Sequence, residues 1–248
     1  MAQWFEDEKF WKTFYSFLFP EQRIKIAAYE VELILKLTGL KGGNILDLCC
    51  GPGRHAVVLA EKGFHVTGLD LSAFMLKKAA ERAEKSGVKV EWIRADMREF
   101  CRPNTFDLII NMFVSFGYFK NENDDVQVLR NVHASLRPGG LLVMDLIGKE
   151  IALDALPAVT CSRHPDGTLW FTRHELVQEC DWVRTEWVIV KGTRAKSTIF
   201  DVRLYSAREL KDLLGRAGFV RVRVCGELDG SNYNRYSRRL VAVAERDS

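Results

Sequence analysis

Four polar side chains stand at or beside the ends of short apolar runs: Asp47, Asp70, Asp96 and Asn111. A single Asp or Asn in such a position often does no more than cap a turn. The carboxyl ends of parallel strands, however, meet at one edge of a sheet, and open α/β sheets bind their ligands at that edge. Four such side chains in one chain therefore predict a binding site there.

A glycine loop adjoins the first of these acids. The stretch Asp47-Leu48-Cys49-Cys50-Gly51-Pro52-Gly53-Arg54-His55-Ala56 follows an apolar run and opens a helical pattern, as in the G-x-G-x-x-A fingerprint of dinucleotide sites. A carboxylate at position 47 would repel the diphosphate of NAD, whereas it complements the cationic amino-acid end of S-adenosylmethionine. Charge therefore favours the methyl donor over NAD.

The two later acids suit an adenosine. Asp70 lies about 20 residues after the loop, where an acid accepts both ribose hydroxyls, a feature that NAD enzymes share. Asp96 is placed to accept from the exocyclic amine of adenine, with Met97 donating its backbone N–H. The predicted cofactor contacts are Asp47, Cys49, Gly51, Gly53, Arg54, Asp70, Leu71, Asp96, Met97, Asn111 and Met112.

The elements that must position these residues form a regular alternation. Between residues 44 and 147 short apolar runs alternate with helical patterns, which is typical of βαβ units and a parallel sheet. Ser72 directly precedes one helical pattern as a predicted N-cap. We predict an α/β, doubly wound core with strands at 44–48, 65–70, 88–94, 106–112 and 141–146, and helices at 54–62, 72–86 and 124–136.

Three segments flank this core. An aromatic stretch, 4–19, precedes a predicted helix at 21–38, and residues 168–204 alternate polar and apolar side chains as antiparallel strands do. A helix at 206–217 and strands near 219–225 and 239–244 follow. The predicted domains are an N-terminal helical lid (1–40), a cofactor-binding core (41–148), an inserted antiparallel substrate cap (149–205) and a C-terminal helix with two strands that complete the core sheet (206–248).

The chain resembles the class I S-adenosylmethionine-dependent methyltransferases, in particular bacterial and archaeal small-molecule enzymes that carry the D-L-C-C-G-P-G-R-H loop found here at 47–55. Cys49 stands where many members have glycine, which changes the tightness of the turn. The resemblance implies a Rossmann-like, seven-stranded sheet, mostly parallel with one antiparallel strand. Further motifs that carry it are Val66-Thr67-Gly68-Leu69-Asp70-Leu71-Ser72, Leu136-Arg137-Pro138-Gly139-Gly140, Tyr205-Ser206-Ala207-Arg208-Glu209-Leu210 and Ala217-Gly218-Phe219.

Methyl transfer from a sulfonium has a good leaving group, so alignment alone supplies much of the acceleration, about 7–11 kcal/mol in well-oriented reactions. An acidic oxygen or a protonated amine as acceptor would need a base, and His174 is the candidate, ahead of His133 and His55. Arg23 and Tyr236, from the two terminal segments, are possible lid residues. The predicted substrate contacts are Tyr15, Phe113, Ser115, Tyr118 and Tyr233.

Composition narrows the alternatives. The 248 residues carry a net charge of only +3, so no nucleic acid is expected. Six scattered cysteines form no C-x-x-C pair and no metal cluster is evident, while the absence of a signal peptide or membrane span favours the cytoplasm. We expect transfer to a small-molecule N or O acceptor, with S-adenosylhomocysteine as product, by a monomer or homodimer. An NAD-linked oxidoreductase and a non-catalytic cofactor-binding module remain alternatives.

Overall fold

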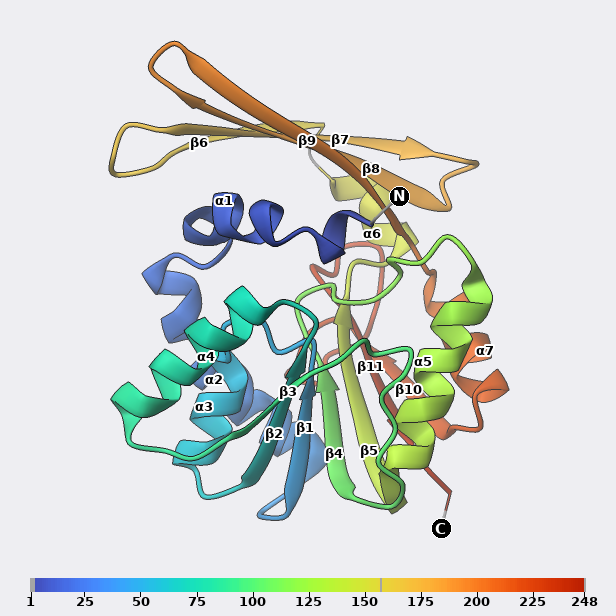
Figure 1. The fold of residues 1–248 in the computed structure, drawn as a ribbon. Coiled ribbons are helices and arrows are strands. Elements are labelled where there is room, and N and C mark those ends of the chain that lie inside the picture. Colours follow the sequence, from blue (N-terminus) through green and yellow to red (C-terminus); the bar gives the residue numbers. More distant parts are fainter. Residues whose placement is uncertain (1–2, 157, 248) are drawn as a thin grey trace.

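A seven-stranded sheet forms the centre of the computed structural model, which describes residues 3–156 and 158–247 (Figure 1). Residues 1, 2, 157 and 248, which fall within the predicted lid, cap and C-terminal ranges, lie outside the described residues. The strands are ordered β10-β11-β5-β4-β1-β2-β3, and β11 alone runs in the opposite direction to the other six. This confirms the predicted fold class. The strand bounds are Asn44–Leu48 (β1), His65–Asp70 (β2), Glu91–Arg94 (β3), Phe106–Asn111 (β4), Leu136–Leu146 (β5), Val220–Cys225 (β10) and Leu240–Glu245 (β11).

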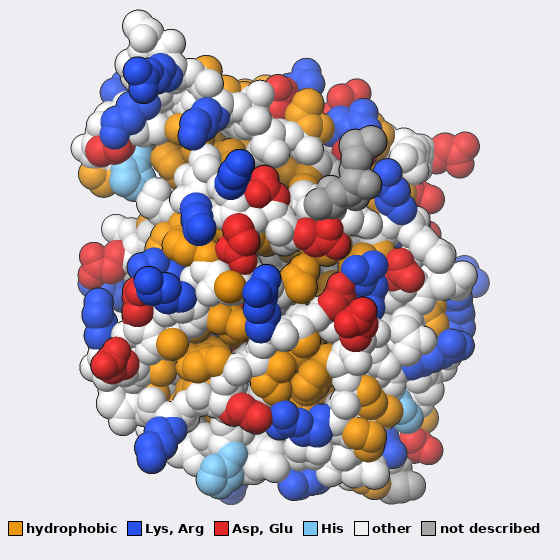
Figure 2. All heavy atoms as spheres, in the orientation of Figure 1, with side chains coloured by type: hydrophobic (Ala, Val, Ile, Leu, Met, Phe, Trp, Pro, Cys, Tyr) orange, Lys and Arg blue, Asp and Glu red, His pale blue; other side chains and the backbone are white. Residues whose placement is uncertain are grey.

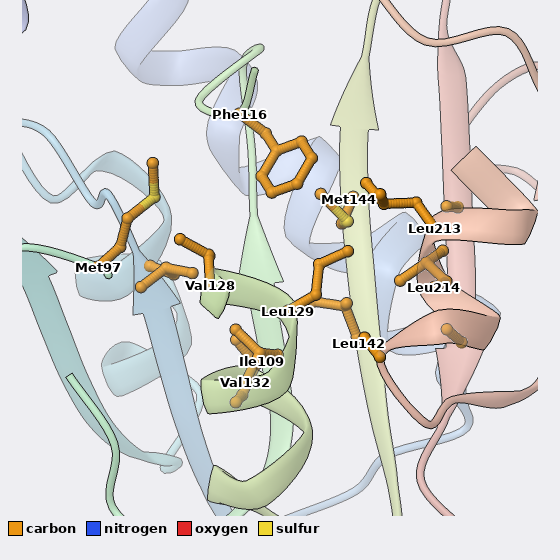
Figure 3. Packing of buried hydrophobic residues seen from close by; sticks show 14 of the residues in the cluster. Met97, Ile109, Phe116, Val128, Leu129, Val132, Leu142, Met144, Leu213 and Leu214 are labelled. Carbon is orange, nitrogen blue, oxygen red and sulfur yellow. The ribbon is translucent and has the colours of Figure 1, made fainter. Parts of the chain in front are cut away.

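Helices cover both faces of this sheet. On one face, α2 (Glu21–Thr38) and α3 (Arg54–Glu61) bury one apolar cluster against the central strands, and α4 (Ala73–Ser86) packs beside α3. On the other face, α5 (Glu122–Ser135) and α7 (Ala207–Arg216) bury a second. Figure 3 shows this second core, in which side chains of β4, β5, α5 and α7 meet: Ile109, Val128, Leu129, Val132, Leu142, Met144, Leu213 and Leu214.

Local sequence signals account for most element ends. The hydroxyl of Ser72 accepts from the backbone N–H of Met75, as its predicted N-cap role requires. Ser206 and Glu209 form a capping box at the start of α7. The third strand was predicted from Val88 but begins at Glu91, because the chain first closes α4 through Gly87 in a left-handed conformation.

A second sheet lies over the carboxyl edge of the first, with α1 (Glu8–Leu18) between them (Figure 1). Phe10 of α1 stacks on Trp187 of this sheet, with ring centroids 5.5 Å apart. The sequence did not predict α6 or β6. Besides α6 (Lys149–Ala155) and the short helix η1 (Trp4–Glu6), the elements here are β6 (Val159–Arg163), β7 (Leu169–Val177), β8 (Trp182–Lys191) and β9 (Arg194–Arg203), all antiparallel.

The molecular surface carries interspersed charges. Lys and Arg side chains are mixed with Asp and Glu side chains over the face seen in Figure 2. None of the helices within 3–156 and 158–247 is long and apolar enough to cross a membrane.

The second loop glycine, Gly53, makes room for a side chain of the core. It has φ 71°, and a Cβ atom there would lie 2.8 Å from the ring of Trp92 and 2.9 Å from Cβ of Ala79. Gly68 of β2 has the same neighbour, since its Cβ would lie 2.4 Å from the Trp92 ring. Both glycines therefore leave space for the indole of Trp92, which extends from β3 over β2 toward the start of α3.

Replacing Gly53 with Ala should lower the free energy of unfolding by about 2–4 kcal/mol, from the left-handed backbone and the overpacking together. Gly39→Ala is the matched control, because its φ is 69° and nothing lies within 4 Å of its Cβ position. It should cost only about 1–2 kcal/mol. Urea unfolding measures both, and equal losses would contradict the packing role of Gly53.

Candidate active site

One cavity of about 510 Å³ lies between the carboxyl edge of the seven-stranded sheet and the four-stranded sheet. This volume falls in the range of small-molecule sites, about 300–1,000 Å³. Its walls come from the loops after β1, β2, β3 and β4, from the N-terminal helices, and from the inner face of β6 to β9. The parallel strands thus bring together acids that are distant in sequence.

Asp47 lies at the floor of the cavity and is buried. Its Oδ2 accepts the backbone N–H of Ala56 in α3 at 3.1 Å. Burial raises the pKa of Asp47 to about 7, although the charge of Arg54 and the Ala56 hydrogen bond lower it. A cation bound beside this carboxyl would favour its ionised form and so lower its pKa, and the ionised carboxylate would attract the cation.

Asp70 closes the glycine loop from the second strand. Its Oδ2 accepts the N–H of Gly51 at 2.8 Å, and its Oδ1 accepts the N–H of Ser72 at 2.9 Å. Burial raises the pKa of Asp70 to about 6, while these two backbone donors lower it. Each carboxylate oxygen keeps a second acceptor site, so the side chain can hold the loop and accept hydroxyl donors together.

Asp96 has a neighbour that the sequence did not suggest. The Arg98 guanidinium donates to both of its oxygens, with Nε 3.1 Å from each and Nη2 2.6 Å from Oδ2. Partial burial raises the pKa of Asp96, but the hydrogen bonds from Arg98 outweigh it and hold the pKa below its usual range. Asp96 is therefore a fixed carboxylate on the cavity wall.

A buried charge network supports the floor. Glu30 of α2 accepts from Arg54, lies 3.0 Å from Nε2 of His55, and accepts from Nη2 of Arg239 at 2.7 Å. Arg239 also donates to Asp145 of β5 at 3.1 Å. Although burial opposes ionisation, His55 and the two arginines hold the pKa of Glu30 far below normal, and burial lowers the pKa of His55 to about 4. Two arginines and two carboxylates thus balance with a neutral imidazole.

The chain leaves β4 in a strained conformation. Phe113 and Val114 have φ of 63° and 59°. Residues other than glycine rarely adopt this backbone region, and β-branched residues such as valine adopt it least. The N–H of Phe113 donates to the Asp145 carboxylate and that of Val114 to the Asp145 carbonyl. The guanidinium of Arg23 lies 4.6 Å from the centre of the Phe113 ring. Asp145 thus holds the strained turn, whose residues Phe113 and Val114 line the cavity.

The structure brings most of the predicted residues to this cavity but not all of them. Asn111 lies beneath it, where its amide donates to the carbonyls of Leu48 and Ser115 and its buried Oδ1 has no partner among the described residues. The predicted residues that line the cavity are Asp47, Cys49, Gly51, Arg54, Asp70, Leu71, Asp96, Met97, Met112, Phe113, Ser115, Tyr118 and His174, together with Arg23 and His55.

Besides Asn111, five of the predicted residues lie outside the cavity lining. Tyr15 packs on Phe19 and Phe74, and the Tyr233 hydroxyl donates to Glu150 at 2.8 Å, so each fills a contact between helices and loops. Gly53 packs against Trp92, as described above. The base candidate His133 packs edge-on against Phe219, and Tyr236 is 80% exposed.

Sequence patterns also missed residues that shape the site. Glu30 and Arg98 are charged side chains inside helical or loop patterns that resemble solvent-facing ones. The cap threonines carry no motif, and only the strand register places them in the cavity. The missed lining residues include Trp4, Trp11, Phe19, Thr160, Trp170, Thr172, Thr185, Trp187 and Phe200.

Known proteins are similar to this chain in sequence and in fold. Residues 45–140 match the family model described as a methyltransferase domain. The chain is 29% identical to the putative methyltransferase YqeM of Bacillus subtilis, over 82% of this chain and 84% of that protein. A methyltransferase structure from Clostridium acetobutylicum superposes with TM-score 0.76 at 17% identity, covering 97% of this chain and 98% of that one.

A second structure is that of the amino pentose methyltransferase CalS10 from Micromonospora echinaspora with S-adenosylmethionine bound. It superposes with TM-score 0.69 at 24% identity, over 90% of each chain. The sheet order is that of the Rossmann-like methyltransferase fold. Residues 45–140 match a methyltransferase domain, and the fold is that of the S-adenosylmethionine-dependent methyltransferases with which the chain superposes.

Glu30→Ala should lower the free energy of unfolding by about 3–5 kcal/mol, because it leaves the buried Arg54 without its carboxylate partner and removes one partner of the half-buried Arg239. The control is Glu32→Ala on the same helix, whose side chain is 63% exposed and contacts only Lys62 at 3.6 Å. Its loss should stay within about 1 kcal/mol. Chemical denaturation at neutral pH compares the two, and similar losses would contradict a central role for Glu30.

The affinity for S-adenosylhomocysteine should rise with pH. Its amino group and ribose hydroxyls favour ionised carboxylates, and the pKa values of Asp47 and Asp70 in the free protein are about 7 and about 6. Each pH unit below either pKa should weaken binding up to about tenfold for that group. Calorimetry between about pH 5 and about pH 8 tests this. Asp47→Asn should make the slope shallower, and a flat profile for the native protein would exclude both groups.

Proposed function

We propose that the protein transfers the methyl group of S-adenosylmethionine to a small molecule bound between the sheet edge and the cap sheet, β6 to β9. The observation that carries this proposal is the continuity of the cavity. The same space is lined by Asp47 and Asp70 at one end and by His174 and Thr185 of the cap sheet at the other. A donor on the loops and an acceptor under the cap would therefore share one enclosure.

The residues on the floor fit the donor. Gly51 has φ 53° and lines the cavity beside Asp70, whose Oδ2 accepts its N–H at 2.8 Å. We assign the donor's amino-acid end to Asp47, its ribose to Asp70 and its adenine amine to Asp96. When bound, the donor supplies an electrophilic methyl group on a sulfonium.

The aromatic walls have two tasks in this proposal. Trp4, Trp11 and Tyr118 line the cavity and exclude water from it, which strengthens electrostatic contacts inside. Phe113 adds a ring near the loop, and its face favours a cation such as the guanidinium of Arg23, which lies 4.6 Å from the ring centre. Exclusion of water and alignment of the two reactants are the means of acceleration that this arrangement supports.

Asp70→Ala should weaken binding of S-adenosylhomocysteine about ten- to 150-fold, the loss of hydrogen bonds to a charged group. Asp212→Ala on the exposed face of α7 is the control, since its side chain is 71% exposed, and it should leave the affinity unchanged. Calorimetry with S-adenosylmethionine, S-adenosylhomocysteine and NAD measures these affinities. Tight binding of NAD without binding of S-adenosylhomocysteine would overturn the proposed function.

A further inference from the structure

We infer that the acceptor is an uncharged, flat molecule with a phenol-type hydroxyl, and that His174, oriented by Thr185, takes the proton of this hydroxyl as the oxygen is methylated. This inference rests on the proposed function and specifies the acceptor end of the same cavity. It is carried by the two faces of the cap sheet and by the contacts of His174.

The cap strands separate charged from neutral side chains. Successive side chains of a strand point to opposite faces. On the outer face Arg173 pairs with Glu186 at 3.1 Å, and Arg184 donates to both oxygens of Asp201 at 2.9 Å. The alternate positions face the cavity and are uncharged: Thr160, Ser162, Trp170, Thr172, His174, Val183, Thr185, Trp187, Phe200 and Val202.

The register gathers the polar members of the inner face into one patch. Thr160 of β6 lies opposite Thr172 of β7, and His174 of β7 lies opposite Thr185 of β8. Since Thr172 and His174 are two residues apart on one strand, the four side chains adjoin. Aromatic side chains border the patch, because Trp187 lies opposite Thr172 and Phe200 opposite Thr185.

This end of the cavity lacks a counter-ion for an ammonium group among the described residues. The carboxylates on the cavity walls, Asp47, Asp70 and Asp96, lie at the carboxyl edge of the seven-stranded sheet, to which we assign the donor. A protonated amine under the cap would therefore lose its hydration without gaining an opposite charge. Hydroxyl and imidazole groups instead suit an uncharged molecule that hydrogen-bonds. The patch thus favours an oxygen acceptor over an amine.

The contacts of His174 are those expected of a general base. Its Nδ1 lies 3.0 Å from Oγ1 of Thr185, and its backbone N–H donates to the carbonyl of Ala158. Nε2 makes no hydrogen bond to any described residue. If Nδ1–H donates to Thr185, Nε2 carries the free lone pair.

Burial lowers the pKa of His174, and no charged neighbour contributes to the shift. The imidazole is therefore neutral and able to accept a proton at neutral pH. The other titratable groups on the walls of the cavity lie outside the cap sheet: Arg23, Asp47, Cys49, Cys50, Arg54, His55, Asp70, Asp96 and Tyr118.

The transfer balances in one step. The acceptor hydroxyl gives its proton to Nε2 of His174 while its oxygen forms a bond to the methyl carbon. The bond from that carbon to sulfur breaks, and its electron pair stays on the sulfur, which becomes a neutral thioether. The protonated imidazole then returns its proton to solvent as the product leaves.

Two further features favour a phenol-type hydroxyl. A phenol has a pKa near 10, so a neutral imidazole can assist its ionisation more readily than that of an aliphatic alcohol. Trp170 lines the cavity beside the patch, and its buried indole N–H has no partner among the described residues. Flat rings pack well against such aromatic walls.

The first experiment measures methyl transfer from tritium-labelled S-adenosylmethionine to catechol, 2-naphthol, benzylamine and glucosamine. We expect labelled ethers from catechol or 2-naphthol and no labelled amines. Labelled amine without labelled ether would overturn the inference and leave the proposed function standing. Failure of all four, while calorimetry shows binding of S-adenosylhomocysteine, would also overturn it. Failure to bind S-adenosylhomocysteine would instead overturn the proposed function.

The second experiment tests His174 with the phenol that is methylated. His174→Gln should lower kcat about 10²- to 10⁴-fold and leave binding of S-adenosylhomocysteine unchanged. The acidic limb of the kcat profile, set by protonation of His174 below its lowered pKa, should disappear with it. The control is His164→Gln, which alters a cap histidine that pairs with Asp166 outside the cavity lining and should keep native kcat.

Thr185 is tested as a positioning residue. Thr185→Val should lower kcat and leave KM nearly unchanged, whereas Thr185→Ser, which keeps the hydroxyl, should restore most of it. Thermal unfolding of each variant confirms that the cap sheet remains folded. Native kcat in His174→Gln, or equal kcat in the valine and serine variants, would overturn the assigned roles.

Discussion

The carboxylate of Glu30 connects parts of the chain that would otherwise meet only through apolar contacts. It joins α2 to the first turn of α3 through Arg54 and His55, and to the C-terminal strand region through Arg239. Arg239 extends the connection to Asp145 of β5, whose backbone and side chain fix the strained turn after β4. The floor of the cavity and one of its walls thus depend on one buried charge.

The effect of removing the Glu30 carboxylate shows what its negative charge does in the buried site. Arg54 would remain buried without a carboxylate partner among the described residues, and Arg239 would keep only Asp145 and Glu227. The network also keeps Arg54 near Asp47, where its positive charge opposes the effect of burial on that carboxyl. The support of the glycine loop and the ionisation of its first acid are therefore coupled.

The cap shows how a strand pattern distributes chemistry between two faces. A period of two residues sends arginines and acids outward, where they pair in solvent, and sends hydroxyls, one imidazole and aromatic rings inward. The seven-stranded sheet concentrates its acids by a different rule, because parallel strands end at one edge. One cavity thus has a charged end and a neutral end, each determined by the type of sheet that builds it.

These two rules also decide what the sequence could predict. The strand-end acids follow from periodicity and loop chemistry, so Asp47, Asp70 and Asp96 were placed on one edge in advance. Glu30 was missed because a charged residue on a helix is normally solvent-facing. Tyr15 and Tyr233 were chosen by side-chain type without a register to direct them, and both point to other contacts. The edge strand β6 was missed because all of its residues are exposed, so no alternation of buried and exposed residues marks it.

The position of β11 has a consequence for the order in which the molecule is assembled. This strand lies between β5 and β10, and Arg239 just before it reaches Glu30, 209 residues away in sequence. Contacts of such separation form late, because the intervening chain must first be closed. During synthesis, the glycine loop and the strand-end acids leave the ribosome long before the segment that supports them. A nascent chain therefore contains every acid of the site before it contains Arg239, whose contacts with Glu30 and Asp145 support the floor of the cavity.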